Sequence, residues 1–123
     1  MWNSYNENPK GQRVGDCVVR AISTALDQSW ERTYIGLCLQ GFEDADLPSS
    51  NAVWSRYLTR RGWQRCTIEE DCTIEDFCKV HPEGVYVVGT GSHAVCVIDG
   101  MLIDSWNSLQ EFALYYFKKR KDD

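Results

Sequence analysis

Apolar residues recur at helical spacing through most of the chain before residue 81 and form short β-branched runs after residue 84. The first pattern predicts four helices, delimited by caps and glycine or proline stops. They run from Cys17 to about Leu26, from a cap at Ser29 to a stop at Gly41, from Ser49 or Ser50 to Gly62, and from a capping box at 73–76 to a point before Pro82.

The second pattern predicts strands at 85–88, around His93, around Leu102 and at 112–117. Asp99-Gly100 between two apolar runs is the signature of a two-residue hairpin turn, which would pair Val97 with Leu102. His93 and Asp104 then share one face as diagonal neighbours, about 7–8 Å apart. Helices followed by an antiparallel sheet predict an α+β fold in which the helix at Cys17 covers one face of this hairpin.

Cys17 is a candidate nucleophile because it stands where a loop passes into a helix. Gly15-Asp16 provides the turn and cap signal before it. A thiol at a helix N-terminus faces unpaired N–H groups and the positive end of the dipole, which lower its pKa. His93 is the candidate base, and Asp104 is the carboxylate expected to orient it.

Three segments resemble the signature segments of papain-like cysteine peptidases. They are Gly15-Asp16-Cys17 opening a helix, His93-Ala94-Val95 entering a strand, and Asp104-Ser105-Trp106 on the next strand. The short chain and the Asp-Cys pair resemble the small bacterial members that trim bacteriocin leaders. The resemblance implies a papain-like core, with the cysteine helix packed on a sheet that carries the histidine, and a Cys17-His93-Asp104 triad.

Two further site residues follow from the resemblance. Papain-like enzymes place a glutamine upstream of the cysteine to help bind the oxyanion; Gln12 is the nearest match, one residue closer than usual. Asn6 or Asn8 could supply the amide instead, and Gln12 could be an ordinary loop residue. Trp106 would shield the histidine pair from water, or simply fill the core, and both interpretations predict that it is buried.

Length, composition and charge limit the domain number, the partners and the localisation that the sequence allows. The 123 residues suit one domain, 1–123, and the net charge of −5 argues against a nucleic-acid partner. The basic run Lys118–Lys121 is interpreted as a solvated tail. No apolar run has transmembrane length and the N-terminus lacks the features of a secretory signal, so we expect a cytoplasmic protein with no membrane partner.

The six cysteines are expected to be reduced thiols rather than a disulfide framework. Cys38 and Cys96 lie in apolar segments and are interpreted as core residues. The only plausible metal cluster in the sequence consists of three cysteines and His81 (Cys66, Cys72 and Cys78). The intervals between these cysteines do not fit a zinc site. No metal and no cofactor is therefore predicted, and His81 is expected to lie in a surface loop without an oriented partner.

The predicted reaction is acyl transfer, most simply hydrolysis of an amide or peptide bond in a peptide or protein substrate. Deamidation, isopeptide cleavage and acyl transfer to an amine remain open. The alternative is a catalytically inactive papain-like binding or inhibitor protein, for instance one of phage or mobile-element origin. The acidic clusters Glu43–Asp46 and Glu69–Asp71 either rim the cleft or form solvated loops. Asp104→Asn is expected to keep much of the activity, and Asp104→Ala to cost far more.

Overall fold

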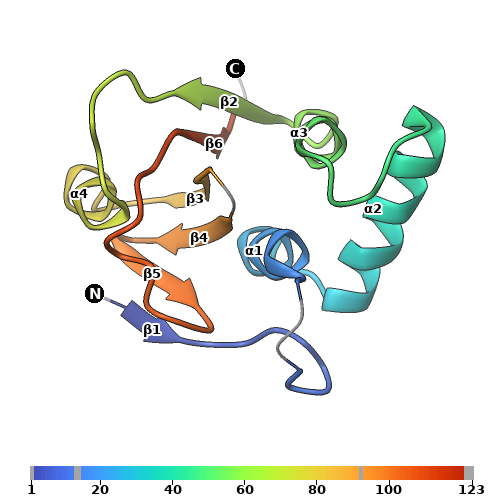
Figure 1. Ribbon diagram of the computed structural model, residues 1–123, viewed down its shortest axis with the longest axis horizontal. Coiled ribbons are helices and arrows are strands. Elements are labelled where there is room, and N and C mark those ends of the chain that lie inside the picture. The colour runs from blue at the N-terminus through green and yellow to red at the C-terminus, as the bar shows by residue number, and fades with distance from the viewer. Residues whose placement is uncertain (1, 13–14, 92, 121–123) are drawn as a thin grey trace.

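A computed structural model of the chain describes residues 2–12, 15–91 and 93–120 (Figure 1). It contains four helices and six strands in this described part. In chain order the elements are β1 (Trp2–Ser4), α1 (Cys17–Leu26), α2 (Trp30–Asp44), α3 (Asn51–Thr59), β2 (Trp63–Thr67), α4 (Ile74–Val80), β3 (Val85–Gly89), β4 (Ala94–Ile98), β5 (Met101–Asp104) and β6 (Tyr115–Lys119). The α+β class predicted from the sequence is confirmed.

The strands form one mixed sheet in the order β1-β5-β4-β3-β6-β2. All neighbours are antiparallel except β1, which runs parallel to β5. The expectation of a purely antiparallel sheet after all the helices was therefore wrong. Both missed strands are edge strands: every residue of β1 is exposed, and in β2 only Trp63 is buried. Neither has the apolar alternation that marks a half-buried strand.

The β4–β5 hairpin has the predicted register. Ile98 pairs with Met101 and Val97 pairs with Leu102. Asp99 (φ 49°) and Gly100 (φ 74°) both occupy the left-handed region, as a type I′ turn requires. This register brings Asp104, the last residue of β5, to the end of β4 that follows His93.

Gly100→Ala is expected to destabilise the protein, because its φ of 74° is unfavourable for a residue with a side chain and a Cβ would lie 3.1 Å from the Cys78 carbonyl oxygen. The expected loss in the free energy of unfolding is about 1–2 kcal/mol, measured by urea denaturation. Gly91→Ala is the matched control, since a Cβ there meets no atom within 4 Å and φ is not in the left-handed region. Equal midpoints for the two variants would contradict this account of the turn.

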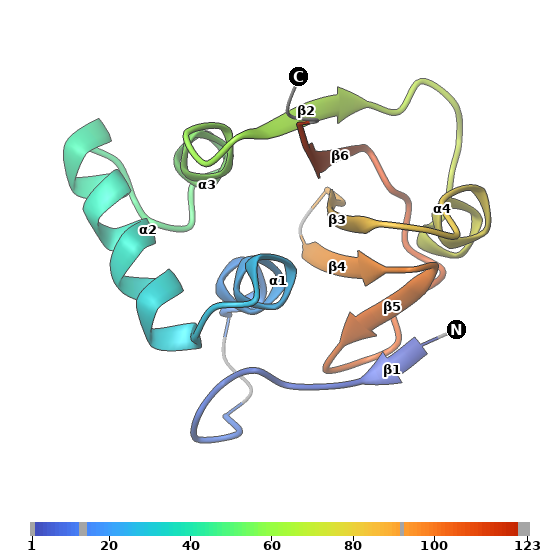
Figure 2. The same ribbon diagram turned by 180° about the vertical axis from the view of Figure 1, so that it is seen from behind.

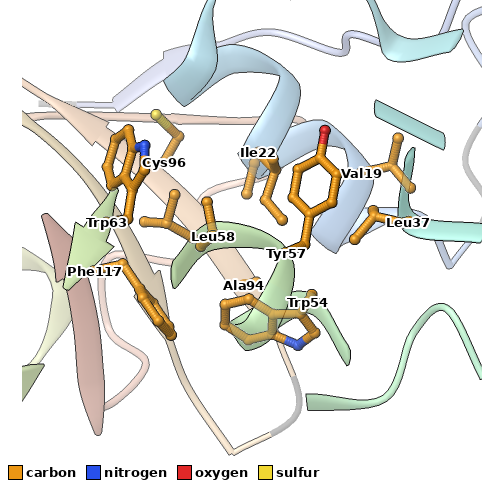
Figure 3. Packing of buried hydrophobic residues seen from close by; sticks show 12 residues of the cluster. Val19, Ile22, Leu37, Trp54, Tyr57, Leu58, Trp63, Ala94, Cys96 and Phe117 are labelled. Carbon is orange, nitrogen blue, oxygen red and sulfur yellow. The ribbon is translucent and has the colours of Figure 1, made fainter. Parts of the chain in front are cut away.

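Helices cover both faces of the sheet (Figures 1 and 2). On one face α1 packs against β4 and β3, α2 lies outside α1, and α3 packs against α2 and the edge strand β2. Figure 3 shows this core, in which Ile22 of α1 and Trp54 of α3 meet Cys96 and Phe117 of the sheet. On the other face, a second cluster joins α4 residues such as Phe77 to the opposite side of the hairpin. The prediction that the Cys17 helix covers one hairpin face is thus confirmed.

Helix boundaries follow the sequence with one exception. α1 matches its predicted range, and the capping box at Thr73 and Asp76 is formed. α2, however, continues through Gly41 to Asp44. Gly41 is needed inside the helix because a Cβ there would lie 2.8 Å from the carbonyl oxygen of Asp46, where the chain folds back. The last strand is also shifted: β6 begins at Tyr115, and Phe112 makes only an isolated bridge to Thr73.

Candidate active site

Cys17 is the first residue of α1, and its backbone N–H therefore has no acceptor within the helix. The predicted cap is different in detail, since the Asp16 side chain makes no capping hydrogen bond. Its carboxylate instead accepts hydrogen bonds from Asn8 Nδ2, Arg20 Nε and Trp30 Nε1 at 3.2, 2.9 and 2.9 Å. Asp16 thus anchors the start of α1, and its carboxylate does not bind the N–H groups of the first turn.

His93 lies immediately before β4, and its position is held by the loop that precedes it. The backbone N–H and the hydroxyl of Thr90 both donate to the His93 carbonyl oxygen, at 2.8 and 3.1 Å. His93 Nε2 lies 2.7 Å from Asp104 Oδ2, and the His93 side chain lines the same cavity as Cys17. Since Nε2 faces the carboxylate, Nδ1 is the ring atom left for the sulfur. The structure therefore brings Cys17, His93 and Asp104 together.

The three groups shift one another's ionisation. Burial disfavours the Cys17 thiolate, but hydrogen bonds from the His93 ring and the Ala94 backbone, with the charges of His93 and Arg20, outweigh it and lower the pKa of the thiol. Burial also disfavours the imidazolium, yet the hydrogen bonds with Asp104 and Cys17 raise the pKa of His93 to about 9. A thiolate facing an imidazolium is the state that these opposite shifts favour.

The Asp104 carboxylate accepts a hydrogen bond from each of four donors. Oδ1 accepts from Arg20 Nη1 at 3.0 Å and from the Ser105 N–H at 2.7 Å. Oδ2 accepts from His93 and from Ser108 Oγ, the latter at 3.1 Å. Burial opposes the charge, but these hydrogen bonds and the adjacent positive charges lower the pKa of Asp104. It is therefore an ionised carboxylate held in a fixed plane.

Arg20 was not singled out from the sequence. It donates from Nε to Asp16 and from Nη1 to Asp104 and Ser105, although its side chain is only 11% exposed. One sequence signal could have identified it: Arg20 is the only charged residue in the apolar stretch that follows Cys17, one turn along the helix and four residues after Asp16.

Trp106 contacts the site but is not buried. Its ring lies over the His93 ring, with centroids 4.8 Å apart and planes inclined by 31°. The indole is nevertheless 45% exposed, so the prediction of burial, common to both interpretations of this residue, was wrong. The reason is its location in the turn beyond β5, where one ring face covers His93 and the other faces solvent.

Gln12 is exposed and lines neither cavity beside Cys17. Its backbone N–H is 3.4 Å from Asn8 Oδ1, and its carbonyl accepts from Asn6 Nδ2. The two asparagines considered as substitutes use their amides within this loop, because Asn8 Nδ2 donates to Asp16. The structure therefore does not bring the amide of Gln12, Asn6 or Asn8 to the sulfur.

A cavity of about 290 Å³ opens beside Cys17 and His93. Apart from Cys17 and His93, its described lining consists of uncharged residues, including Gly15, Asn51 and Gly91. Neither acidic cluster rims it. Glu43 and Asp44 pair with arginines of the α3 region (Arg60 and Arg56), and Glu69–Asp71 line a separate cavity next to α4. The structure therefore does not support the alternative in which these clusters rim the cleft.

The other cysteines and His81 do not form a second reactive centre in the described part of the chain. All six thiols are free, and no group of three or more metal-ligating side chains occurs among the described residues. Cys96 is a core residue, as predicted, and its burial raises the pKa of its thiol to about 12, whereas Cys38 is only half-buried. His81 differs from expectation: Nδ1 is 3.2 Å from the Phe77 carbonyl oxygen and the ring stacks on Phe77.

Comparisons with protein families, with characterised proteins and with solved structures gave no match to this chain. No helix in the described ranges is long and apolar enough to cross a membrane.

Of the predicted basic tail, Lys118 and Lys119 belong to β6 and Lys121 lies outside the described residues.

Proposed function

We propose that this protein is a cysteine hydrolase of papain-like type that cleaves an amide or peptide bond through an acyl-enzyme. The observation that carries the proposal is the juxtaposition of Cys17, at the start of a helix, with His93, which lines the same cavity and whose Nε2 lies 2.7 Å from the Asp104 carboxylate. Nucleophile, base and orienting group in contact are the arrangement that activates a thiol for attack on a carbonyl.

The residues suggest the following steps. The Cys17 thiolate attacks the carbonyl carbon of the substrate, and the C–N bond breaks as the His93 imidazolium gives its proton to the departing amine. The resulting thioester is cleaved by water, from which the neutral His93 takes a proton; the carboxylic product leaves and the thiolate–imidazolium pair is restored. The oxyanion formed in each half accepts a hydrogen bond from the Cys17 N–H at the positive end of α1.

Selective alkylation tests the first step. At neutral pH, Cys17 is expected to react with iodoacetamide at least tenfold faster than any other cysteine, because its thiol pKa is lowered. Burial raises the pKa of the Cys72, Cys78 and Cys96 thiols, which therefore serve as internal controls. Mass spectrometry of the partly alkylated chain locates the modified residue, and a Cys17 no more reactive than the other five would refute the proposal.

A second candidate function is a binding or inhibitor protein that keeps the frame without turnover. The absence of the Gln12 side chain from the two cavities beside Cys17 favours it, because hydrolysis of an amide normally relies on two donors to the oxyanion. A cysteine-directed acyl probe distinguishes the two functions. A hydrolase forms a thioester on Cys17 that water releases, whereas a binding protein stays unlabelled while Cys17 is intact.

The substrate and the compartment follow from the same proposal. The reaction suits a peptide or protein substrate, and the otherwise uncharged cleft next to Cys17 and His93 is compatible with an uncharged substrate residue there. Six free thiols agree with a reducing compartment such as the cytoplasm. A peptide-library cleavage profile would define the preferred sequence and separate peptidase from deamidase activity.

A further inference from the structure

Arg20 occupies an unusual position for a cation, since it points from α1 into the interior between the start of the helix and the end of β5. Its side chain is 11% exposed, and those of its two carboxylate partners, Asp16 and Asp104, are 6% and 3% exposed. Charges this far from water persist only when they are paired and hydrogen-bonded. The guanidinium meets this condition with Nε on Asp16 at 2.9 Å and Nη1 on Asp104 at 3.0 Å.

The two partners have opposite places in the site. Asp16 immediately precedes Cys17, whereas Asp104 accepts the hydrogen bond from His93. Arg20 therefore connects the residue beside the nucleophile to the residue that orients the base. The Ser105 hydroxyl, 2.7 Å from Nη1, fixes the guanidinium further.

We propose that Arg20 is a positioning residue of the Cys17–His93–Asp104 group: anchored by Asp16, it holds Oδ1 of Asp104 so that Oδ2 is directed at Nε2 of His93. This role rests on the proposed function, because it concerns the same three residues. It acts through geometry, since a carboxylate with one oxygen fixed by two donors cannot turn the other away from the ring. It also places a positive charge beside Cys17, where that charge favours the thiolate.

Lysine cannot reproduce this arrangement. A guanidinium presents donors at several fixed positions and reaches two carboxylates at once, whereas an ammonium is a single point on a flexible stem. Arg20→Lys thus keeps the charge and loses the bridge, and Arg20→Met loses both. Comparison of the two variants separates the electrostatic effect from the geometric one.

Further ionisable groups lie near the Cys17 sulfur and the Arg20 guanidinium. Tyr5 and Glu7 of the N-terminal segment line the small cavity next to Cys17 and Arg20. Glu7 hydrogen-bonds Tyr5 and raises the pKa of its phenol, so Tyr5 remains neutral where Cys17 titrates. Asp16, Asp104 and His93 complete the set that faces the sulfur and the guanidinium.

The test uses two measurements on the full chain that need no substrate. The first is the pH dependence of Cys17 alkylation by iodoacetamide. The second is NMR of protein labelled with ¹⁵N-histidine, which carries only His81 and His93, so that the Nε2 proton shared with Asp104 is observed directly. The matched control is Arg61→Met, because Arg61 stacks 3.5 Å from the Tyr57 ring and lines a cavity remote from the sulfur.

Arg20→Met is expected to move the acid limb of the alkylation profile up by about one pH unit, a tenfold lower rate at a fixed pH on that limb, and to lose the slowly exchanging His93 proton. Arg20→Lys is expected to keep the acid limb nearer to that of the wild type and still lose the protected proton. Arg61→Met should retain both. A merely structural role would lower the unfolding midpoint and leave both measurements unchanged.

The inference is overturned if folded Arg20→Met and Arg20→Lys show the wild-type alkylation profile and the wild-type His93 signal. Should Arg20→Met fail to fold, Arg20→Lys and Asp16→Asn provide the test. Asp16→Asn removes the carboxylate that anchors Arg20 and is expected to speed the exchange of the His93 Nε2 proton. A wild-type signal of this proton in both variants would refute the proposed bridge from Asp16 through Arg20 to Asp104. Failure of the proposed function is distinct, because wild-type Cys17 would then have the alkylation profile of an ordinary thiol whatever stands at position 20.

Discussion

Substitution of Cys17 by alanine is expected to abolish acylation and turnover while leaving the fold intact. The sulfur is the attacking atom of the proposed reaction, and an alanine methyl group cannot form a thioester, so turnover should fall by about 10³-fold or more. The fold should persist because Cys17 is only half-buried and alanine is the best helix former at the first turn of α1. Labelling by an acyl probe and cleavage of a peptide library are the two measurements.

Cys66→Ala is the matched control for this substitution. Cys66 is also half-buried, but it lies in edge strand β2, and its sulfur is 3.9 Å from the Gln64 carbonyl oxygen. Probe labelling should therefore be unchanged in Cys66→Ala and absent in Cys17→Ala. Labelling that survives in Cys17→Ala would assign the reaction to another residue, and loss of cooperative unfolding would make Cys17 a packing residue instead.

Elements whose residues contact near neighbours in sequence could be predicted from the sequence. α1 begins at Cys17 because a turn signal precedes an apolar helical pattern, and the hairpin register follows from two residues with positive φ at Asp99 and Gly100. Register in turn determines that His93 and Asp104 share a face, so their contact at 2.7 Å was predictable in kind.

What the sequence did not reveal depends on tertiary contacts. β1 has no apolar pattern and exists because it pairs with β5 and because Trp2 Nε1 donates to the Asp104 carbonyl oxygen. Arg20 resembles an ordinary helical arginine until the end of β5 is placed opposite it. The exposure of Trp106 likewise depends on where the turn after β5 lies, which local propensity does not determine.

The environment of Asp104 also changes what is expected of Asp104→Asn. Residue types alone suggested that an amide oxygen could replace the carboxylate and that much of the activity would remain. In the structure all four partners of the carboxylate are donors: Arg20, Ser105, His93 and Ser108. An amide offers one acceptor oxygen and an NH₂ group that only donates, so it cannot satisfy both pairs.

Two orientations of the asparagine are available. With its oxygen toward His93, the NH₂ group faces the buried Arg20 guanidinium, and these unmatched donors cost about 1–3 kcal/mol. With its oxygen toward Arg20 and Ser105, the NH₂ group faces His93 Nε2, which must then accept the bond. The ring proton then resides on Nδ1, the atom that should take the proton of Cys17. The positive charge of Arg20 favours this second, inactive orientation.

We therefore expect Asp104→Asn to lower turnover by about 10³-fold, comparable to Asp104→Ala, with the chain still folded. Ser108→Ala, which removes one neutral donor to Oδ2, should have a much smaller effect and is the matched control. The double variant Arg20→Met with Asp104→Asn should be less impaired than the product of the single effects, because without the guanidinium the amide oxygen is free to turn toward His93. An Asp104→Asn protein that keeps more than half of the wild-type turnover would show that the Arg20 bridge does not fix the orientation of the side chain at position 104.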